Sequence, residues 1–285
     1  MTNFFILAGG LGTRAEPLSS ILPKPLFPLG GKPLLKLLAE QLKSNRFRRG
    51  FINVHHKASM ITDFPLPGLD TTYLKEETLS GNRILSTIGN YTNEDLLVIN
   101  GDTYIDIPCL QLQKELDQSG SDGVILVRKK DGVYSSIITH DRFFKKRDKD
   151  PEITDIMYAG VSIFKNSFLK KLRSENLFDS LEKSGGSIRI IEYNKIWLDL
   201  GTPENYFHSN AIFREKERIH SSNSLSDDIF ISDNAEVINS IIWNNTKISG
   251  HTTIRDSIVT GNQEIREKNF LKKIVTEKGI FNLSV

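Results

Sequence analysis

A cluster of glycines directly after a short apolar run is the feature that most constrains the fold of this chain. The apolar run covers Phe4–Leu7 and predicts a buried strand. Gly9, Gly10 and Gly12 then let the backbone approach a ligand closely and leave successive N–H groups free to face anionic oxygen. Such a loop after a strand is typical of α/β proteins, in which ligands bind beyond the carboxyl ends of the strands.

Two cations and two prolines follow the glycines. Arg14 and Lys24 add positive charge beside the loop, and Pro23 and Pro25 hold the lysine in a stiff segment. The glycines alone would favour an ordinary turn next to two solvated cations. With Arg14 and the Pro-Lys-Pro run added, the pattern favours a pocket for a nucleoside triphosphate.

The composition is that of a globular protein, and the length is sufficient for one large domain and an appendage. The chain has 285 residues, of which 38% are hydrophobic and 25% are charged, and its net charge of +2 gives no field that favours nucleic acid or an anionic membrane. No apolar run approaches the ~20 residues that span a bilayer, and the N-terminus lacks the pattern of a signal peptide. A single cysteine, Cys109, fits a reducing compartment. We therefore expect a cytoplasmic protein that binds neither nucleic acid nor membrane.

Strand-like and helix-like runs alternate through the first two thirds of the chain. This alternation predicts an α/β fold, with a Rossmann-like, mostly parallel mixed sheet and helices on both faces. The expected strands cover Phe4–Leu7, Gly50–Val54, Thr71–Leu74, Leu96–Ile99, Val124–Val127, Gly160–Phe164 and Ile188–Tyr193. The expected helices cover Pro33–Ser44, Ser167–Leu172, Leu177–Lys183 and the run from Pro203 to about Ile219.

The C-terminal segment carries a repeat of 17 residues. Ile231-Ser232 recurs as Ile248-Ser249, and a third, weaker copy begins at Ile265. This period with regularly spaced β-branched residues is typical of a β-helix, whose coils stack on one another, although a β-meander with chance similarity is an alternative. We expect a first domain over residues 1–220, a linker over 221–230 and a β-helix of about three coils over 231–285. The β-helix should pack on the first domain or on another subunit.

Two further apolar runs end in an aspartate. The run at 96–99 is followed by Asn-Gly-Asp, which places Asp102 at the same edge of the sheet as the glycine loop. Asp199 precedes Gly-Thr-Pro, where Thr202 and Pro203 predict a helix start. A strand-ending aspartate is commonly a turn or cap residue, but a carboxylate at this edge can also hold Mg²⁺.

The run LAGGLGTRAEPLSSILPKPLFPLGGKPLL over residues 7–35 resembles the signature of sugar-1-phosphate nucleotidyltransferases, L-A-G-G-x-G-T-R-L-x-P-L-T followed by P-K-P. Ala15 stands where the family usually has leucine. The resemblance extends more loosely across most of the chain. It implies the nucleotide-diphospho-sugar transferase fold with a left-handed β-helix, and an N-G-D and W-x-D-x-G-T-P metal site in which Asp102 and Asp199 hold Mg²⁺.

The resemblance also implies the reaction and the roles of the site residues. A sugar 1-phosphate attacks the α-phosphorus of a nucleoside triphosphate and releases pyrophosphate, with Arg14 and Lys24 as catalytic residues. The sugar phosphate is expected at Gly160 and Lys146, although the register leaves Lys145 as an alternative to Lys146. The residues expected to bind the nucleotide are Leu7, Ala8, Gly9, Gly10, Gly12, Thr13, Glu76, Gly81 and Asn100.

The largest departure from the family lies at residues 76–83, which read EETLSGNR. The family typically has E-x-P-L-G-T-A-G or L-x-T-G-G there, a glycine-rich loop against the nucleobase and the sugar. Asn82 and Arg83 replace small residues, so the base preference stays open. An exposed acidic pair is a second interpretation of Glu76 and Glu77.

Several alternatives remain at this level. Within the family, the run Asn100–Asp106 and the tail most resemble mannose-1-phosphate and heptose-1-phosphate guanylyltransferases, so we expect GTP with one of these sugar phosphates. A UTP- or dTTP-dependent enzyme, such as an N-acetylmuramate-1-phosphate uridylyltransferase, and a non-catalytic regulatory subunit of the same fold are the alternatives. A dinucleotide-binding oxidoreductase is excluded because the glycines do not form G-x-G-x-x-G and no acidic residue ends the strand at Val54. As to assembly, a homo-oligomer formed through the β-helix is one possibility that the sequence leaves open.

Overall fold

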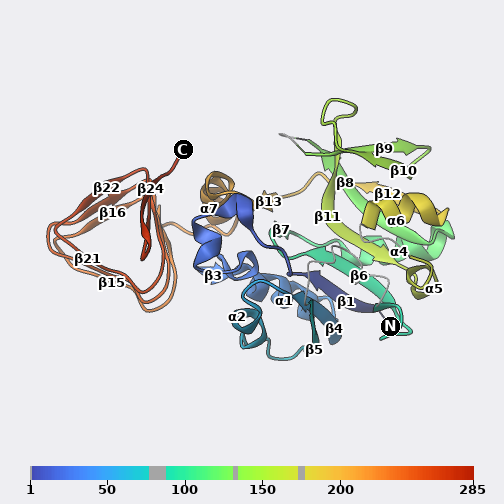
Figure 1. Ribbon diagram of the computed structural model, residues 1–285, viewed down its shortest axis with the longest axis horizontal. Coiled ribbons are helices and arrows are strands. Elements are labelled where there is room, and N and C mark those ends of the chain that lie inside the picture. The colour runs from blue at the N-terminus through green and yellow to red at the C-terminus, as the bar shows by residue number, and fades with distance from the viewer. Residues whose placement is uncertain (1, 77–87, 131–133, 173–176) are drawn as a thin grey trace.

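The computed structural model describes residues 2–76, 88–130, 134–172 and 177–285. A nine-stranded mixed sheet and a stack of short strands lie on either side of helix α7, as Figure 1 shows. The strand order of the sheet is β5-β4-β1-β6-β11-β8-β12-β10-β9, and all strands except β11 and β10 run in the same direction. The strands are β1 (Thr2–Leu7), β4 (Arg49–Val54), β5 (Asp70–Lys75), β6 (Asp95–Asn100), β8 (Gly123–Lys129), β9 (Ser136–His140), β10 (Phe143–Asp148), β11 (Ile156–Phe164) and β12 (Ile188–Glu192).

Helices cover both faces of this sheet, which confirms the expected α/β fold. Phe4 and Ile6 of β1 are fully buried in one core with α1, α4 and α7, while Phe5 faces a second core with α5 and α6. Because both faces are covered, β1 is apolar without alternation. The helices are α1 (Leu34–Ser44), α2 (Ala58–Thr62), α4 (Cys109–Ser119), α5 (Asn166–Leu169), α6 (Leu177–Ser184) and α7 (Pro203–Lys216), with 3₁₀ turns at Thr13–Ala15, Leu18–Ser20 and Lys24–Leu26.

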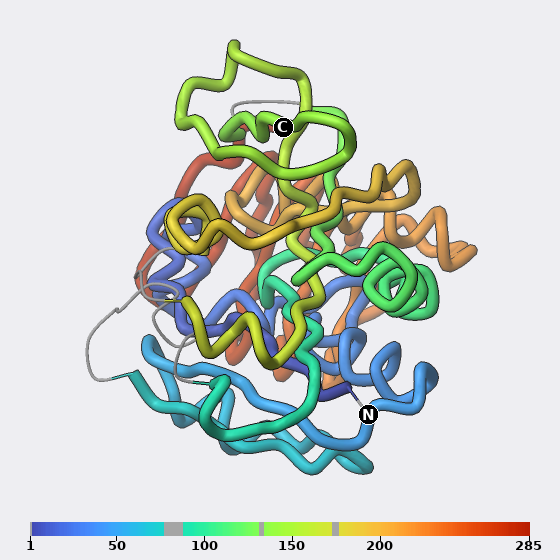
Figure 2. Tube along the Cα trace, turned by 90° about the vertical axis from the view of Figure 1, so that its right-hand side faces the viewer, coloured from blue at the N-terminus to red at the C-terminus, as the bar shows by residue number. Residues whose placement is uncertain are grey.

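The expected elements exist, with shifted ends. The strand expected from Gly160 begins earlier, at Ile156, and the helix expected to reach Leu172 ends at Leu169 because the chain continues there in i→i+3 turns. Two short pairs were not predicted, the hairpin of β2 (Pro28–Leu29) and β3 (Lys32–Pro33), and the antiparallel pair of β7 (Thr103–Ile105) and β13 (Trp197–Asp199). In Figures 1 and 2 the β9–β10 ribbon lies at the top of the domain and β4 and β5 lie at the bottom.

The C-terminal strands form a β-helix, in which successive coils stack and their strands make three sheets along its sides. Its first strand, β14 (Ser224–Leu225), pairs in parallel with β17 and so lies inside the segment expected to be a linker. Paired positions are 17 residues apart in the first coils, as in Ile241 opposite Ile258, and 16 apart in the next, as in Ile258 opposite Ile274. The other strands are β15 (Phe230–Ile231), β16 (Glu236–Ile238), β17 (Ile241–Ile242), β18 (Lys247–Ser249), β19 (Thr253–Arg255), β20 (Ile258–Val259), β21 (Glu264–Arg266), β22 (Asn269–Leu271), β23 (Lys273–Thr276) and β24 (Gly279–Asn282).

Recurring polar residues hold neighbouring coils together. Asn245 and Asn262 both adopt the left-handed conformation at a corner, which asparagine tolerates, and their side chains are joined by a hydrogen bond of 3.3 Å. The hydroxyl of Ser240 accepts a hydrogen bond from the backbone N–H of Ser257 in the next coil, at 3.1 Å. These ladders explain why serine and asparagine recur with the apolar positions.

The β-helix packs directly on the first domain. Ile241, Trp243 and Ile274 belong to the same hydrophobic core as α1 and α7. At Gly31, which has a φ of +86°, an added Cβ would lie only 2.1 Å from the carbonyl oxygen of Leu225. At Gly31 the two parts of the chain therefore meet backbone against backbone, with no room for a side chain between them.

Candidate active site

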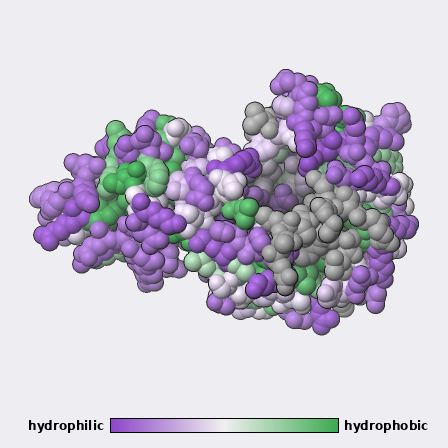
Figure 3. Space-filling model, viewed as in Figure 1, coloured by the Kyte–Doolittle hydropathy of each residue, from purple (hydrophilic) through white to green (hydrophobic). Residues whose placement is uncertain are grey.

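A cleft lies at the carboxyl ends of β1 and β6, where Figure 3 shows a hollow in the mostly hydrophilic face. It consists of two adjoining cavities of about 260 and 290 Å³ that share Asn100 and Asp102. We call the first the glycine cavity; it is lined by Leu7, Ala8, Gly9, Gly10, Gly12, Lys24, Pro25, Asn53, Glu76, Asn100, Gly101 and Asp102. We call the second the aromatic cavity; it is lined by Arg14, Asn100, Asp102, Thr103, Tyr134, Ser135, Ile137, Arg147, Met157, Tyr158, Ala159, Gly160, Phe178, Trp197 and Asp199.

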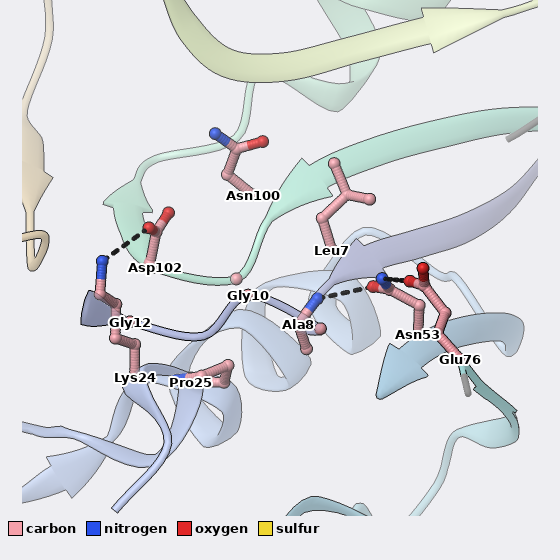
Figure 4. A pocket seen from close by; sticks show the side chains of 12 residues that line it. Leu7, Ala8, Gly10, Gly12, Lys24, Pro25, Asn53, Glu76, Asn100 and Asp102 are labelled. Carbon is pink, nitrogen blue, oxygen red and sulfur yellow. Dashed lines mark hydrogen bonds and ion pairs between the residues drawn. The ribbon is translucent and has the colours of Figure 1, made fainter. Parts of the chain in front are cut away.

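A short hydrogen-bonded chain orders one end of the glycine cavity. The side-chain oxygen of Asn53 accepts a hydrogen bond from the backbone N–H of Ala8 at 2.7 Å, and its amide donates to the carboxylate of Glu76 (Figure 4). A Cβ at Gly9 would lie 2.7 Å from the Asn53 amide nitrogen, so the close approach requires glycine. Glu76 is only 8% exposed, which makes the interpretation as an exposed acidic pair wrong for this residue.

The glycine loop lines the cavity as predicted, except at Thr13. Gly12 has a φ of +73°, and a Cβ there would lie 2.9 Å from the side chain of Ser19, whereas Gly10 has open space around it. Thr13 is exposed and lines neither cavity. Gly81, the remaining residue expected at the nucleotide, lies outside the described residues, as does Glu77.

Lys24 lies where the two cavities meet. Its side chain is 11% exposed, and its Nζ lies 3.4 Å from Oδ2 of Asp102, which is 37% exposed (Figure 4). Pro23 precedes the 3₁₀ turn that begins at Lys24, so the backbone directs this side chain into the cleft. A fixed ammonium group at this junction can attract phosphate oxygens in either cavity.

The short pair of β7 and β13 brings two carboxylates to the aromatic cavity. Asp199 pairs with Thr103, the residue after Asp102, and the N–H of Leu200 donates to the carbonyl of Asp102 at 3.1 Å. The Asp199 side chain is 8% exposed and accepts three hydrogen bonds. These come from Tyr134 Oη at 2.8 Å, from Asn205 Nδ2 at 2.9 Å and from the backbone N–H of Gly201 at 3.0 Å.

These two carboxylates fit the donor set of a magnesium site. Within the described parts of the chain, no group of three or more His, Cys, Asp or Glu side chains could hold a metal ion. Mg²⁺ does not need such a group, because it prefers oxygen ligands and commonly binds through one or two carboxylates together with substrate phosphates. Asp102 and Asp199, both lining one cavity, match this pattern.

Of the remaining predicted site residues, two line the aromatic cavity and one faces solvent. Arg14 lines the aromatic cavity, and so does Gly160, whose φ of +87° coincides with a register shift between β11 and β8. Lys146 lines neither cavity: its side chain is half exposed and its Nζ lies 3.1 Å from Asp148. Arg147 lines the aromatic cavity instead, which corrects the prediction of Lys146.

Aromatic rings line the aromatic cavity, and two arginines stack on them. The guanidinium of Arg147 lies 5.0 Å from the ring centre of Phe178, and that of Arg128 lies 4.6 Å from the ring centre of Trp197. Trp197 is fixed by a hydrogen bond from its Nε1 to the carbonyl of Ala159 at 3.1 Å. Burial raises the pKa of Tyr158 above its usual range, so this tyrosine stays neutral at the cavity wall.

Comparison with known proteins decides the family. The family model described as "Nucleotidyl transferase" matches residues 4–216, which is most of the chain. This chain belongs to the nucleotidyl transferase family. The expected class of enzyme, a sugar-1-phosphate nucleotidyltransferase, is thereby confirmed.

Three relatives illustrate the range of the nucleotidyl transferases that this chain resembles. The D-glycero-alpha-D-manno-heptose 1-phosphate guanylyltransferase of Campylobacter jejuni is 27% identical over 224 residues, covering 71% of this chain and 96% of that protein. The UTP–glucose-1-phosphate uridylyltransferase of Synechocystis is 23% identical over 237 residues, covering 72% of this chain and 61% of that protein. The crystal structure of HddC from Yersinia pseudotuberculosis complexed with GMP-PN matches with a TM-score of 0.64 and 27% identity, covering 75% of this chain and 100% of that one.

None of the described helices of this nucleotidyl transferase is both long enough and apolar enough to cross a membrane.

Proposed function

We propose that this nucleotidyl transferase joins GTP and mannose- or heptose-1-phosphate into a GDP-sugar and pyrophosphate, in a reaction that depends on Mg²⁺. The observation that carries the proposal is the junction of the two cavities, where Lys24 lies 3.4 Å from Asp102. One cavity offers backbone N–H groups and the other offers arginines and aromatic rings. Two phosphorylated substrates can therefore meet with their phosphates at Lys24.

The glycine cavity is assigned to the triphosphate. Its backbone N–H groups cradle anionic oxygens, and its far end holds the buried carboxylate of Glu76. Guanine presents two neighbouring donors on its Watson–Crick edge, N1–H and the N2 amino group, whereas uracil and thymine present one. A carboxylate accepts from two such donors at once, so Glu76 supports guanine, in agreement with the guanylyltransferase relative.

The aromatic cavity is assigned to the sugar 1-phosphate. Trp197 gives the cavity an aromatic surface for a sugar ring, and Gly160 lets the ring approach the backbone. Arg147 presents a planar guanidinium, which can bind a phosphate through two hydrogen bonds. We assign the sugar phosphate to Arg147 in place of Lys146.

The chemistry requires positioning and charge neutralisation rather than a general base. A phosphate monoester has a second pKa of about 6, so the sugar phosphate is largely a dianion at neutral pH. Its oxygen forms the new bond to the α-phosphorus while the bond to pyrophosphate breaks in line, and the electron pair leaves with pyrophosphate. Lys24 draws the incoming phosphate toward the α-phosphorus, and Arg14, which lines the aromatic cavity together with Asp102 and Asp199, adds positive charge beside the reacting phosphates. Mg²⁺ held by Asp102 and Asp199 would supply further positive charge against the phosphate oxygens.

Replacing Arg147 by methionine tests the sugar-phosphate assignment. We expect the KM for the sugar 1-phosphate to rise about tenfold or more, because a hydrogen bond to a charged group contributes about 1.5–3 kcal/mol. Lys146→Met is the matched control. It removes the same charge at the neighbouring residue, whose side chain points to solvent. Steady-state kinetics at saturating triphosphate measure both variants. A larger effect at Lys146 than at Arg147 would restore the original assignment.

The function itself is tested by pyrophosphate release over a matrix of substrates. GTP, UTP, dTTP, ATP and CTP are each combined with the 1-phosphates of mannose, heptose, glucose and N-acetylmuramate. We expect the highest kcat/KM with GTP and mannose- or heptose-1-phosphate, at least tenfold above any other triphosphate. Preference for UTP or dTTP would overturn the choice of base, and no turnover with any pair would favour a non-catalytic regulatory subunit.

A further inference from the structure

Three aromatic side chains meet where the β-helix joins the first domain. They are Phe27, just after the Lys24 turn, Tyr206 in α7, and Trp243 in the β-helix, and we call them the neck triad. Their ring centres lie 5.2 Å apart for Phe27 and Tyr206, and 5.4 Å apart for Phe27 and Trp243. All three side chains are at most 1% exposed. Such a fully buried aromatic cluster fixes the relative positions of the segments that carry it.

Two hydrogen bonds run through the triad. The indole Nε1 of Trp243 donates to the hydroxyl of Tyr206 at 3.0 Å, and that hydroxyl donates to the carbonyl of Pro28 at 2.7 Å. The side-chain oxygen of Asn210, also in α7, accepts a hydrogen bond from the backbone N–H of Gly30 at 2.9 Å. The β-helix, α7 and the segment after Lys24 are thus joined by directional contacts as well as by packing.

One arm of the triad leads to Lys24. The backbone N–H of Phe27 donates to the carbonyl of Lys24 at 3.0 Å, so the two residues close one tight turn. Because Phe27 is fully buried, a shift of its ring moves that turn. The Lys24 ammonium group would move with it, away from its place 3.4 Å from Asp102.

The other arm leads to Asp199. Asn205, the neighbour of Tyr206 in α7, donates to the Asp199 carboxylate at 2.9 Å. Ser209, one turn further along α7, donates to the Asp199 backbone carbonyl at 3.1 Å. The position of α7 therefore sets the position of the Asp199 carboxylate.

We propose that Trp243 is a positioning residue for nucleotidyl transfer: it holds the Lys24 turn and helix α7 at one fixed separation. The proposal rests on the proposed function, which gives Lys24 and Asp199 their roles. Trp243 is itself fixed within the β-helix, since its N–H donates to the carbonyl of Val259 at 2.9 Å and its carbonyl accepts from the Thr246 hydroxyl at 2.7 Å. The β-helix thus supports catalysis through this buried side chain, which lies among the other β-helix residues of the shared core.

The test compares three variants of the full chain. Trp243→Ala removes the ring, Trp243→Phe keeps a ring and removes the indole N–H, and Ile254→Ala is the matched control. Ile254 is fully buried in a separate core whose members all come from the β-helix. Its truncation removes a large buried side chain and leaves a cavity, as Trp243→Ala does, without touching the neck triad.

For Trp243→Ala we expect kcat to fall tenfold or more, at a temperature at which all variants are folded. The dissociation constant of a non-hydrolysable GTP analogue should change by less than about threefold, because the glycine loop is not part of the neck. Ile254→Ala should keep kcat within about twofold of the unaltered protein. Trp243→Phe should retain most of the kcat that Trp243→Ala loses. A displacement of about 1 Å can cost on the order of 100-fold in rate, so the effect is large enough to measure.

Amide hydrogen exchange gives a second readout that needs no turnover. Trp243→Ala should speed exchange at residues 24–29 and 199–206, and Ile254→Ala should not. If Trp243→Ala does not fold, Tyr206→Phe removes the hydroxyl that joins both hydrogen bonds and should show the same pattern at smaller size. Equal kcat in Trp243→Ala and Ile254→Ala, or unchanged exchange at both segments, would overturn the proposal. If the unaltered protein turns over no substrate pair, the proposed function fails, and the exchange data alone decide whether Trp243 positions these segments.

Discussion

Lys24→Ala is expected to lower the rate of pyrophosphate release about 100-fold or more while leaving the affinity for the triphosphate within about threefold. The reason is the location of the ammonium group, which lies at the junction of the two cavities beside Asp102. Removal of one preorganised donor at a developing charge typically costs about 2.7–4 kcal/mol in the transition state. Triphosphate binding depends more on the backbone N–H groups of the glycine loop, which this substitution leaves in place.

Single-turnover kinetics and direct titration with a GTP analogue separate these two quantities. Lys36→Ala is the control, because Lys36 is an exposed lysine of α1 and its loss changes the net charge equally. The control should behave like the unaltered protein in both measurements. Equal losses in rate and in triphosphate affinity for Lys24→Ala would argue against its action on the incoming phosphate.

Asp199→Asn is expected to reduce turnover about 100-fold and to raise the Mg²⁺ concentration needed for half-maximal rate. The substitution keeps the shape of the side chain and removes the charge that would hold the metal with Asp102. Three donors face the Asp199 carboxylate, from Tyr134, Asn205 and Gly201. The side-chain NH₂ group of the new asparagine would itself face one or more of these donors, which then have no acceptor. An unsatisfied buried donor costs about 1–3 kcal/mol, so a lower melting temperature should accompany the loss of activity.

Turnover measured against Mg²⁺ concentration, together with thermal unfolding, checks this prediction. Asp117→Asn is the control, since Asp117 is an exposed aspartate of α4 that lines neither cavity. A variant at Asp199 that retains more than a tenth of the activity with an unchanged Mg²⁺ requirement would falsify the metal assignment.

The central part of the site could be predicted because it follows local patterns. The glycine loop and Asp102 each follow the apolar run of a strand, and in a parallel sheet such strand ends meet at one edge. The strand pairing that brings Asp199 beside Asp102 could not be predicted from local sequence patterns. Strands β7 and β13 have three residues each, too few for any periodicity, and only the family resemblance joined the two carboxylates.

The sequence pattern left Lys145 as an alternative to Lys146, whereas a backbone irregularity brings the next residue, Arg147, to the cavity. In a regular strand alternate side chains share a face, but the pairing of β10 with β9 shifts register between Phe144 and Lys146. This shift leaves Lys146 toward solvent and Arg147 at the cavity. A bulge of this kind leaves no mark in the sequence that could be read without the partner strand.

Tyr134 and Asn205 were missed for a different reason. Tyr134 lies in no motif, and its role depends on a hydrogen bond to Asp199, which is 65 residues away in the chain. Asn205 could have been found, because a helix that starts at Pro203 places residue 205 in the first turn, beside the residues before the helix. The β-helix was likewise predictable from its 17-residue period, whereas its first strand was hidden in a polar run at Ser221–Asp228.

The close approach of Leu225 to Gly31 bears on how the molecule folds and unfolds. Separable domains are usually joined by exposed linkers across which few contacts pass, but here one hydrophobic core continues from α1 and α7 into Ile241, Ile258 and Ile274. Neither part can lose its structure without uncovering apolar surface on the other. The β-helix and the sheet therefore form one cooperative unit, in which a methyl group added at residue 31 would act as a wedge between the two halves.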